Sequence, residues 1–140
     1  MSSDMTSWIE DERNKVIRYL DEKGIRHRGV SSEPAWSVAP LLAIWPVLAS
    51  ENEGSVSWWV ISGDAPTDHI ASDGVSEVKE AVSAFSKRWM ELCGRISRGE
   101  PHADFQIDRP DEWPDLGELL FRRAKLLAEF AGADDLWKWQ

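Results

Sequence analysis

The thirteen residues Trp58–Ile70 constrain the fold of this chain more than any other stretch. They begin with an apolar run, which breaks at Gly63 into a segment that holds two carboxylates and a histidine. A short run of aromatic and β-branched residues that ends at a glycine is typical of a buried strand. Side chains alternate along a strand, so Trp58 and Trp59 should point to opposite faces of a sheet. We expect one of them in the core and the other against a helix or lining a groove.

A second apolar run, Leu41–Trp45, lies between two prolines, and residues 51–54 have the composition of a turn. Together with the first run they predict an antiparallel hairpin with arms at residues 41–48 and 55–62. Both arms are nearly all apolar, as expected for strands that are covered by other elements. A helix over residues 37–45 is an alternative, because Pro40 is compatible with a first helical turn.

Three amphipathic helices are predicted around this hairpin. Ser7 and Glu10 match a capping box, which predicts a helix over residues 8–23 that ends at Gly24. A stripe of apolar residues at helical spacing from Val78 to Ile96 predicts the second helix. A similar stripe from Leu116 to Phe130 predicts the third. The sequence therefore predicts the α+β class: a small antiparallel sheet with a central hairpin, covered by about three amphipathic helices. No linker or repeat divides the chain, so we expect a single domain over residues 1–140.

Acidic residues are concentrated in the middle of the chain. The net charge is −9, and residues 29–78 contribute −7 because they contain seven Asp and Glu and no Lys or Arg. Nucleic-acid binding draws most of its affinity from basic side chains on phosphates, and anionic lipid attracts basic segments in the same way. We therefore expect no nucleic-acid or membrane partner, and favour a basic protein or a cationic ligand.

The segment after the predicted second arm carries the candidate site residues. Asp64, Thr67, Asp68 and His69 lie in a predicted loop over residues 63–74, where a sheet would hold the loop by its base. One carboxylate could orient His69 as a general base, or the two carboxylates and the imidazole could ligate a metal. The structural alternative is that Asp64 bonds the turn backbone and Asp68 caps a short helical turn. The structural role is the more frequent one for such short patterns.

Nine tryptophans are several times the usual number for a chain of 140 residues. Most should pack in the core, since large aromatic side chains are usually buried. Trp36 lies outside the strong apolar stripes, and with Trp59 it is a candidate wall of a binding groove. Trp137 and Trp139 also lie outside those stripes and are candidates for a homodimer contact.

Metal and cofactor chemistry has no recognisable pattern in this chain. The three histidines and the single Cys93 lack zinc-ligand spacing, and no glycine-rich phosphate loop or nucleophile elbow occurs. We expect no metal and no cofactor. The single cysteine, the lack of a signal-like N-terminus and the lack of long apolar runs predict a soluble cytoplasmic protein.

Three segments together resemble a known family. They are the run from Ala39 to Pro46, the pattern Trp-Trp-Val-Ile-Ser-Gly-Asp-x-Pro-Thr-Asp from Trp58, and Phe85 with Arg88 and Trp89. This combination is similar to a family of small bacterial proteins that is classed as a domain of unknown function. The resemblance covers most of residues 8–100 and is less distinctive in the C-terminal helix. It implies a bacterial cytoplasmic protein and supplies no activity, cofactor or catalytic residue.

Two functional hypotheses follow from these patterns. The first is a non-enzymatic protein-interaction module with an acidic, Trp-rich surface, such as an inhibitor, an immunity-like protein or an adaptor. The alternative is a small metal- or water-using enzyme centred on Asp64, Asp68 and His69. The enzyme hypothesis requires that these three side chains converge within hydrogen-bonding reach.

Overall fold

The computed structural model describes residues 2–38, 41–48, 56–65, 67–97 and 113–133. The chain divides into two compact units, residues 1–81 and residues 82–140. The first unit holds one helix and a five-stranded antiparallel sheet, and helix α2 (Val78–Ser97) begins in it. The second unit holds the rest of α2 and helix α3 (Trp113–Gly132). The predicted α+β class is confirmed, and the single domain stays a prediction.

Helix α1 (Ser2–Lys23) is longer than the sequence predicted. The capping box at Ser7 is wrong as a helix start, because residues 2–6 contain neither proline nor glycine and the helix extends through them. The predicted end is confirmed at Gly24, which has a φ of 71°. Its amide donates to the Asp21 carbonyl, and the Ile25 amide donates to the Leu20 carbonyl. This pair of hydrogen bonds is the Schellman arrangement that satisfies the last carbonyls of a helix.

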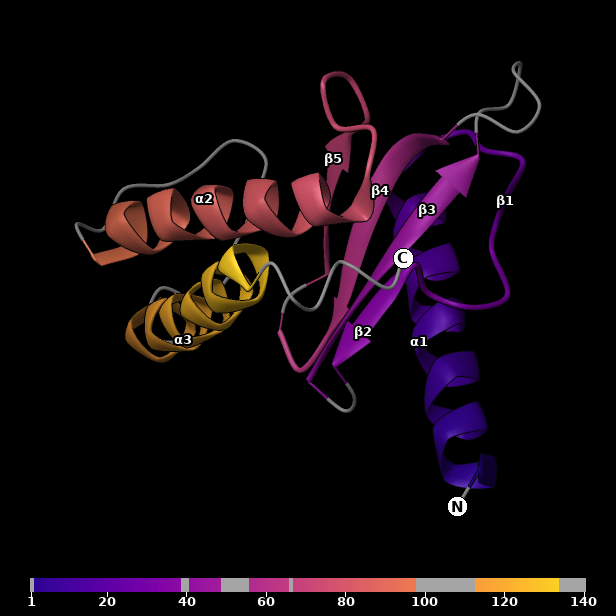
Figure 1. Ribbon diagram of the computed structural model, residues 1–140, viewed down its shortest axis with the longest axis horizontal. Coiled ribbons are helices and arrows are strands. Elements are labelled where there is room, and N and C mark those ends of the chain that lie inside the picture. Colours follow the sequence, from indigo (N-terminus) through magenta and orange to yellow (C-terminus); the bar gives the residue numbers. More distant parts are fainter. Residues whose placement is uncertain (1, 39–40, 49–55, 66, 98–112, 134–140) are drawn as a thin grey trace. The chain divides into compact units, whose positions relative to one another are not determined.

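The sheet is built around the predicted hairpin. Strands β3 (Leu42–Leu48) and β4 (Val56–Gly63) pair antiparallel, which confirms the two arms to within one residue (Figure 1). Strand β5 (Asp68–Ala71) pairs with the other edge of β4, and the short strands β1 (Gly29–Val30) and β2 (Trp36–Val38) pair with β3. The alternative helix over residues 37–45 is wrong, since β2 and β3 occupy that region.

The predicted loop over residues 63–74 is also partly wrong, because it contains β5. The sequence of β5 gives little signal: it has only four residues, and two of them, Asp68 and His69, are polar. A strand of this kind forms because β4 offers it a full ladder of backbone partners, not because its own residues favour the extended state.

The strand register sorts side chains onto two sheet faces. Trp45, Val60 and His69 are cross-strand partners and share one face, and α1 packs there through Val16 and Leu20. We call this side the α1 face. Its buried core residues are Val16, Leu20, Val30, Ala43, Trp45, Val47 and Val60.

The opposite face carries a different row of cross-strand partners. Trp36, Ile44, Ile61 and Asp68 follow one another across β2, β3, β4 and β5. All four are buried, the two isoleucines completely. Apolar side chains on both faces explain why the arms of the hairpin read as continuous apolar runs.

The second unit is stabilised by the predicted helical stripes. Phe85, Trp89 and Leu92 on α2 are buried, as are Leu120, Ala124 and Leu127 on α3. The Ser86 hydroxyl donates to the Ala124 carbonyl at 2.9 Å in a buried position, which ties the two helices together. Alanine in place of Gly117 would put a Cβ 3.2 Å from the Ile96 side chain, so α3 is packed closely against α2 at that position.

Candidate functional site

The segment that follows β4 is held by backbone contacts at Gly63. A Cβ at this position would lie 2.2 Å from the Leu41 carbonyl oxygen, and its φ is 135°. Only glycine fits such an approach. The Leu41 carbonyl accepts the Asp64 amide at 2.8 Å, so the end of β4 is fastened to the start of β3.

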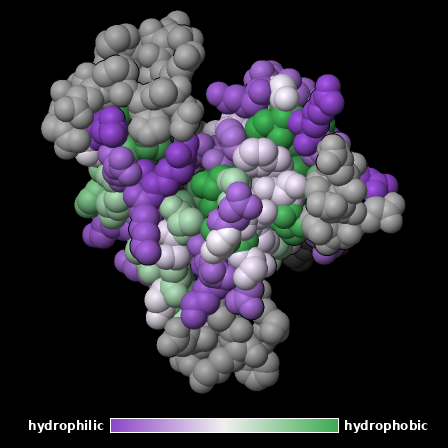
Figure 2. All heavy atoms as spheres, turned by 90° about the horizontal axis from the view of Figure 1, so that it is seen from above, coloured by the Kyte–Doolittle hydropathy of each residue, from purple (hydrophilic) through white to green (hydrophobic). Residues whose placement is uncertain are grey.

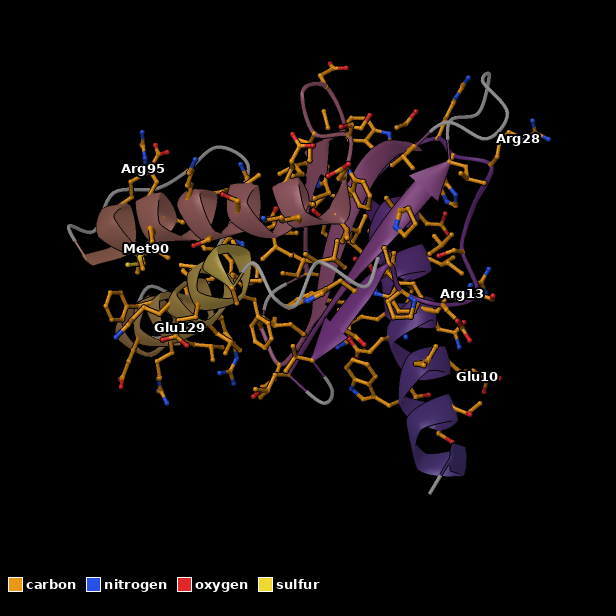
Figure 3. All side chains as sticks on the ribbon, in the orientation of Figure 1. Glu10, Arg13, Arg28, Met90, Arg95 and Glu129 are labelled. Carbon is orange, nitrogen blue, oxygen red and sulfur yellow. The ribbon has the colours of Figure 1, made fainter. Side chains whose placement is uncertain are left out.

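Helix α1 also reaches this segment. The Lys15 ammonium donates to the Gly63 carbonyl at 3.3 Å and pairs with the Glu12 carboxylate at 2.9 Å. Glu12 is 6% exposed, so its charge depends on this lysine for a partner. On the other side of α1, Arg13 donates to the carbonyls of Val30 and Ser31 and secures the end of β1 (Figure 3). These contacts are structural and position α1 on the sheet.

Asp68 is buried at the start of β5. Its side chain is on the face opposite α1, the residue is 1% exposed, and a carboxylate oxygen accepts the backbone amide of His69 at 2.9 Å. The Ser72 amide donates to Ser57 and thereby fixes the alternation of the β4–β5 ladder, which turns the His69 amide away from β4. Asp68 therefore satisfies an amide on the outer edge of the sheet. The predicted helical turn capped by Asp68 is wrong, because this residue begins a strand.

His69 is on the α1 face, and its surroundings were not predicted. Its Nδ1 lies 2.5 Å from the Tyr19 hydroxyl, and its ring contacts the rings of Tyr19 and Trp58 edge-on, with centroids 5.6 and 5.5 Å apart. All three side chains are half-buried. The imidazole is thus enclosed by an aromatic pair, with a hydroxyl as its polar partner.

The structure separates two of the candidate polar residues, Asp68 and His69. Asp68 and His69 are consecutive on β5, so their side chains lie on opposite faces of the sheet. Asp64 is exposed beyond the end of β4, and Thr67 is half-buried. The geometry in which Asp68 would orient His69 as a base is therefore absent from this arrangement.

The two candidate groove tryptophans are buried. Trp36 is 9% exposed and faces Ile44 across the β2–β3 pair. Trp59 is 4% exposed, and its indole N–H donates to the Val75 carbonyl at 2.9 Å. Neither side chain is positioned as the wall of an open surface groove, and the expectation of Trp36 at the surface is corrected.

Trp58 and Trp59 lie on opposite faces of the sheet, as predicted. Trp59 anchors the connection between β5 and α2, while Trp58 packs against the core on the α1 face. In the same strand, the Ser62 hydroxyl accepts the buried indole N–H of Trp45 at 3.1 Å. The polar side-chain atoms of Trp59, Ser62 and Asp68 are therefore engaged in holding the fold.

Tyr19 is a neighbour of His69 that the sequence did not predict. It is the only tyrosine in the chain, and it lies on α1 between Val16 and Leu20, both of which are fully buried. Its place beside the apolar stripe was an available signal for a half-buried hydroxyl. Its partner could not be identified, because His69 is 50 residues away in the sequence.

No group of three or more His, Cys, Asp or Glu side chains in the described part of the chain is arranged to hold a metal ion. None of the helices described here combines the length and apolar composition needed to cross a bilayer. Cys93 is half-buried on α2. Trp137 and Trp139, the candidates for a dimer contact, lie outside the described residues.

Comparison with known proteins places the chain in a family without assigning it a reaction. Neither the curated proteins nor the solved structures contain a match to it. The model of the family described as Domain of unknown function (DUF4826) matches residues 3–137, and the chain belongs to this family.

Proposed function

We propose that the protein is a non-enzymatic interaction module that binds a basic protein partner through acidic side chains of residues 29–78. The observation that carries this proposal is the exposure of carboxylates in a segment without any Lys or Arg. Of its seven acidic residues, Glu33, Asp64, Asp73 and Glu77 are exposed, whereas Asp68 is buried. A surface of one sign attracts an oppositely charged partner and disfavours like-charged ones.

The use of polar groups inside the first unit supports a binding role over catalysis. Ser62 satisfies Trp45, Asp68 satisfies the His69 amide, and the sheet separates Asp68 from His69. A general base needs an orienting partner and access to substrate. The enzyme alternative requires Asp68 and His69 to converge, so their opposite faces disfavour it.

The tryptophans contribute less to this surface than their number suggests. Trp36, Trp45, Trp59 and Trp89 are buried, and Trp8 and Trp58 are half-buried against the core on the α1 face. Figure 2 shows hydrophilic side chains interspersed with hydrophobic ones on the face in view. The proposed contact therefore depends on carboxylates, and a homodimer through Trp137 and Trp139 is a separate proposal. The family resemblance and the single cysteine support a bacterial cytoplasmic setting.

The best place to test the acidic surface is the connection between β5 and α2. Asp73 and Glu77 are exposed there and lie four residues apart. The buried Asp68 is unsuitable for charge reversal, because a lysine at that position would put an uncompensated charge in the core. Asp21 and Glu22, both exposed on α1, offer a matched control with the same change in net charge.

The experiment is affinity capture from the native host with three tagged proteins: the wild type, D73K/E77K and D21K/E22K. A basic protein captured by the wild type should bind D73K/E77K about tenfold more weakly, equivalent to ~1.4 kcal/mol. Binding of D21K/E22K should remain near the wild-type level. The wild-type affinity should also fall as salt is raised. Capture of no basic protein, or equal weakening by both variants, contradicts the proposal.

A further inference from the structure

Strand β5 forms one end of the described sheet. It pairs with β4 on one side, and in the strand order β1-β3-β4-β5 no described strand follows it on the other. The Ser72 amide donates to the Ser57 carbonyl, and this pair fixes the alternation along the ladder. The backbone N–H and C=O groups of His69 and Ala71 therefore point away from β4, toward the outer edge.

The two outward positions of β5 differ in whether their groups are already used. The Asp68 carboxylate accepts the His69 amide at 2.9 Å, so this amide already has an acceptor. Ala71 is exposed, and among the described residues neither its N–H nor its C=O takes part in a hydrogen bond. An edge residue with both groups open can pair with an extended segment of another chain. The open part of the edge is therefore its C-terminal end, at Ala71.

A fixed turn places a carboxylate beside this open end. The Val75 amide donates to the Ser72 carbonyl at 2.8 Å and closes a β-turn with Asp73 as its second residue. The Trp59 indole N–H donates to the Val75 carbonyl at 2.9 Å, so the turn is tied to β4. Asp73 is exposed and follows Ala71 by two residues, which places their Cα atoms at most about 7 Å apart.

The segment that contains the open edge is acidic. Residues 63–78 contain no Lys or Arg, and their acidic residues are Asp64, Asp68, Asp73 and Glu77. All of these except Asp68 are exposed. A strand added to β5 would lie about 4.8 Å from it, so long basic side chains at its end can reach Asp73. Two copies of β5 side by side would instead bring like charges together, which disfavours self-association through this edge.

We propose that the basic partner adds an extended segment to β5 at Ala71, as a further strand of the sheet. The Ala71 N–H and C=O pair with the backbone of that segment, and a Lys or Arg near its end pairs with Asp73. This mode of binding rests on the proposed function, and it makes the bound part of the partner an extended basic segment rather than a helix. Backbone pairing supplies affinity, and the acidic turn supplies selectivity for positive charge.

The probe for this binding mode is a short synthetic peptide of alternating Lys and Val, which is cationic and carries β-branched residues that favour a strand. It is titrated into the full chain, and amide exchange is followed by nuclear magnetic resonance. Saturation with the peptide should slow exchange of the Ala71 amide by roughly 2- to 12-fold, the range for the net free energy of one hydrogen bond. A peptide that does not bind, or an Ala71 amide whose exchange is unchanged at saturation, overturns the binding mode.

The variant A71P tests the role of the outward N–H. Proline removes this donor and leaves the ladder with β4 in place, because the Ala71 amide points away from β4. A71P should bind the peptide roughly 2- to 12-fold more weakly than the wild type. The matched control is A71V, which enlarges the side chain but keeps both backbone groups, and it should bind like the wild type. Equal weakening by A71P and A71V contradicts the binding mode, because the side chain would then cause the effect.

The variant D73K/E77K distinguishes the binding mode from the proposed function. It should weaken binding of the peptide, since it reverses the charge beside the open edge. If D73K/E77K weakens binding and A71P does not, the acidic surface binds cations without strand addition, and only the binding mode is wrong. If neither variant weakens binding, the peptide binds elsewhere; the binding mode is then overturned, and the capture experiment alone decides the proposed function. The exchange of Ala71 in the wild type keeps the test decisive even if A71P fails to fold.

Discussion

Strands β4 and β5 are joined by a few residues and form one ladder, but they are held in different ways. In β4, Val60, Ile61 and Ser62 are fully buried. In β5, one polar residue is buried on one face and the other is half-buried on the opposite face. Strand β4 is therefore fixed by packing on both faces, whereas β5 is held by its backbone ladder with β4 and by the side-chain hydrogen bonds of Asp68 and His69. A site that responds to its surroundings belongs on the second kind of strand, because local opening is least costly where few buried contacts are lost.

The largest effect should come from the end of β4. Gly63→Ala introduces a Cβ that would meet the Leu41 carbonyl in a backbone conformation that alanine rarely adopts. We expect the free energy of unfolding to fall by roughly 2–4 kcal/mol, from combined strain and overpacking. Urea denaturation measures it. Gly74→Ala is the control, because Gly74 has a φ of 74° but an unobstructed Cβ position, and it should cost about 1 kcal/mol.

The next effect should come from the buried polar pair in the hairpin. Ser62→Ala leaves the Trp45 indole N–H without its acceptor and should destabilise the protein by about 2 kcal/mol. In the Trp45→Phe background the same substitution should cost much less, since the donor is already gone. Additive costs in the double variant would show that the pair does not interact.

A smaller effect is expected at the start of β5. Asp68→Ala removes the acceptor of the His69 amide and should cost about 1.5 kcal/mol, less than Ser62→Ala because an edge amide can reach water. Asp68→Asn keeps an oxygen at the same place and should recover most of this loss. A cost for Asp68→Ala above that of Gly63→Ala would break the distinction between the two strands.

The smallest effect should come from the α1 contact. Tyr19→Phe keeps the aromatic packing against His69 and loses only the hydroxyl, so we expect a loss of about 1 kcal/mol at pH 7.5. Exchange protection should fall most near the end of α1, with the β3–β4 ladder unchanged. Equal loss of protection throughout the sheet would mean that β5 and β4 are a single cooperative element.

The sequence predicted the parts of the fold whose signal lies in long apolar patterns. The hairpin and the stripes of α2 and α3 were confirmed because buried strands require continuous apolar runs and buried helix faces require apolar residues at helical spacing. Both patterns can be recognised in the sequence. The start of α1 was wrong because a capping pattern inside a helix has the same residues as one at its start. Strand β5 was missed because its partner strand supplies most of the reason for its conformation.

The candidate site was harder to predict from the sequence than the fold. Asp68 and His69 are neighbours in sequence, and that nearness suggested a joint role. Once they are on a strand, the period of two assigns them to opposite faces, and only the register reveals it. Conversely, Tyr19 reaches His69 across 50 residues, and no local pattern reports a contact between a helix and a distant strand. His69 stays a candidate site residue, and the partner that the structure gives it, Tyr19, lies outside the motif.

Helix α1 has a consequence for synthesis of the chain. It leaves the ribosome before the strands that cover its apolar side, and its His69 partner follows Tyr19 by 50 residues. At usual rates of translation this interval is roughly 3–10 s. Until the strands have been made, Val16 and Leu20 lack their full set of native partners from the sheet, so the nascent chain presents an amphipathic helix to whatever binds such surfaces near the ribosome exit.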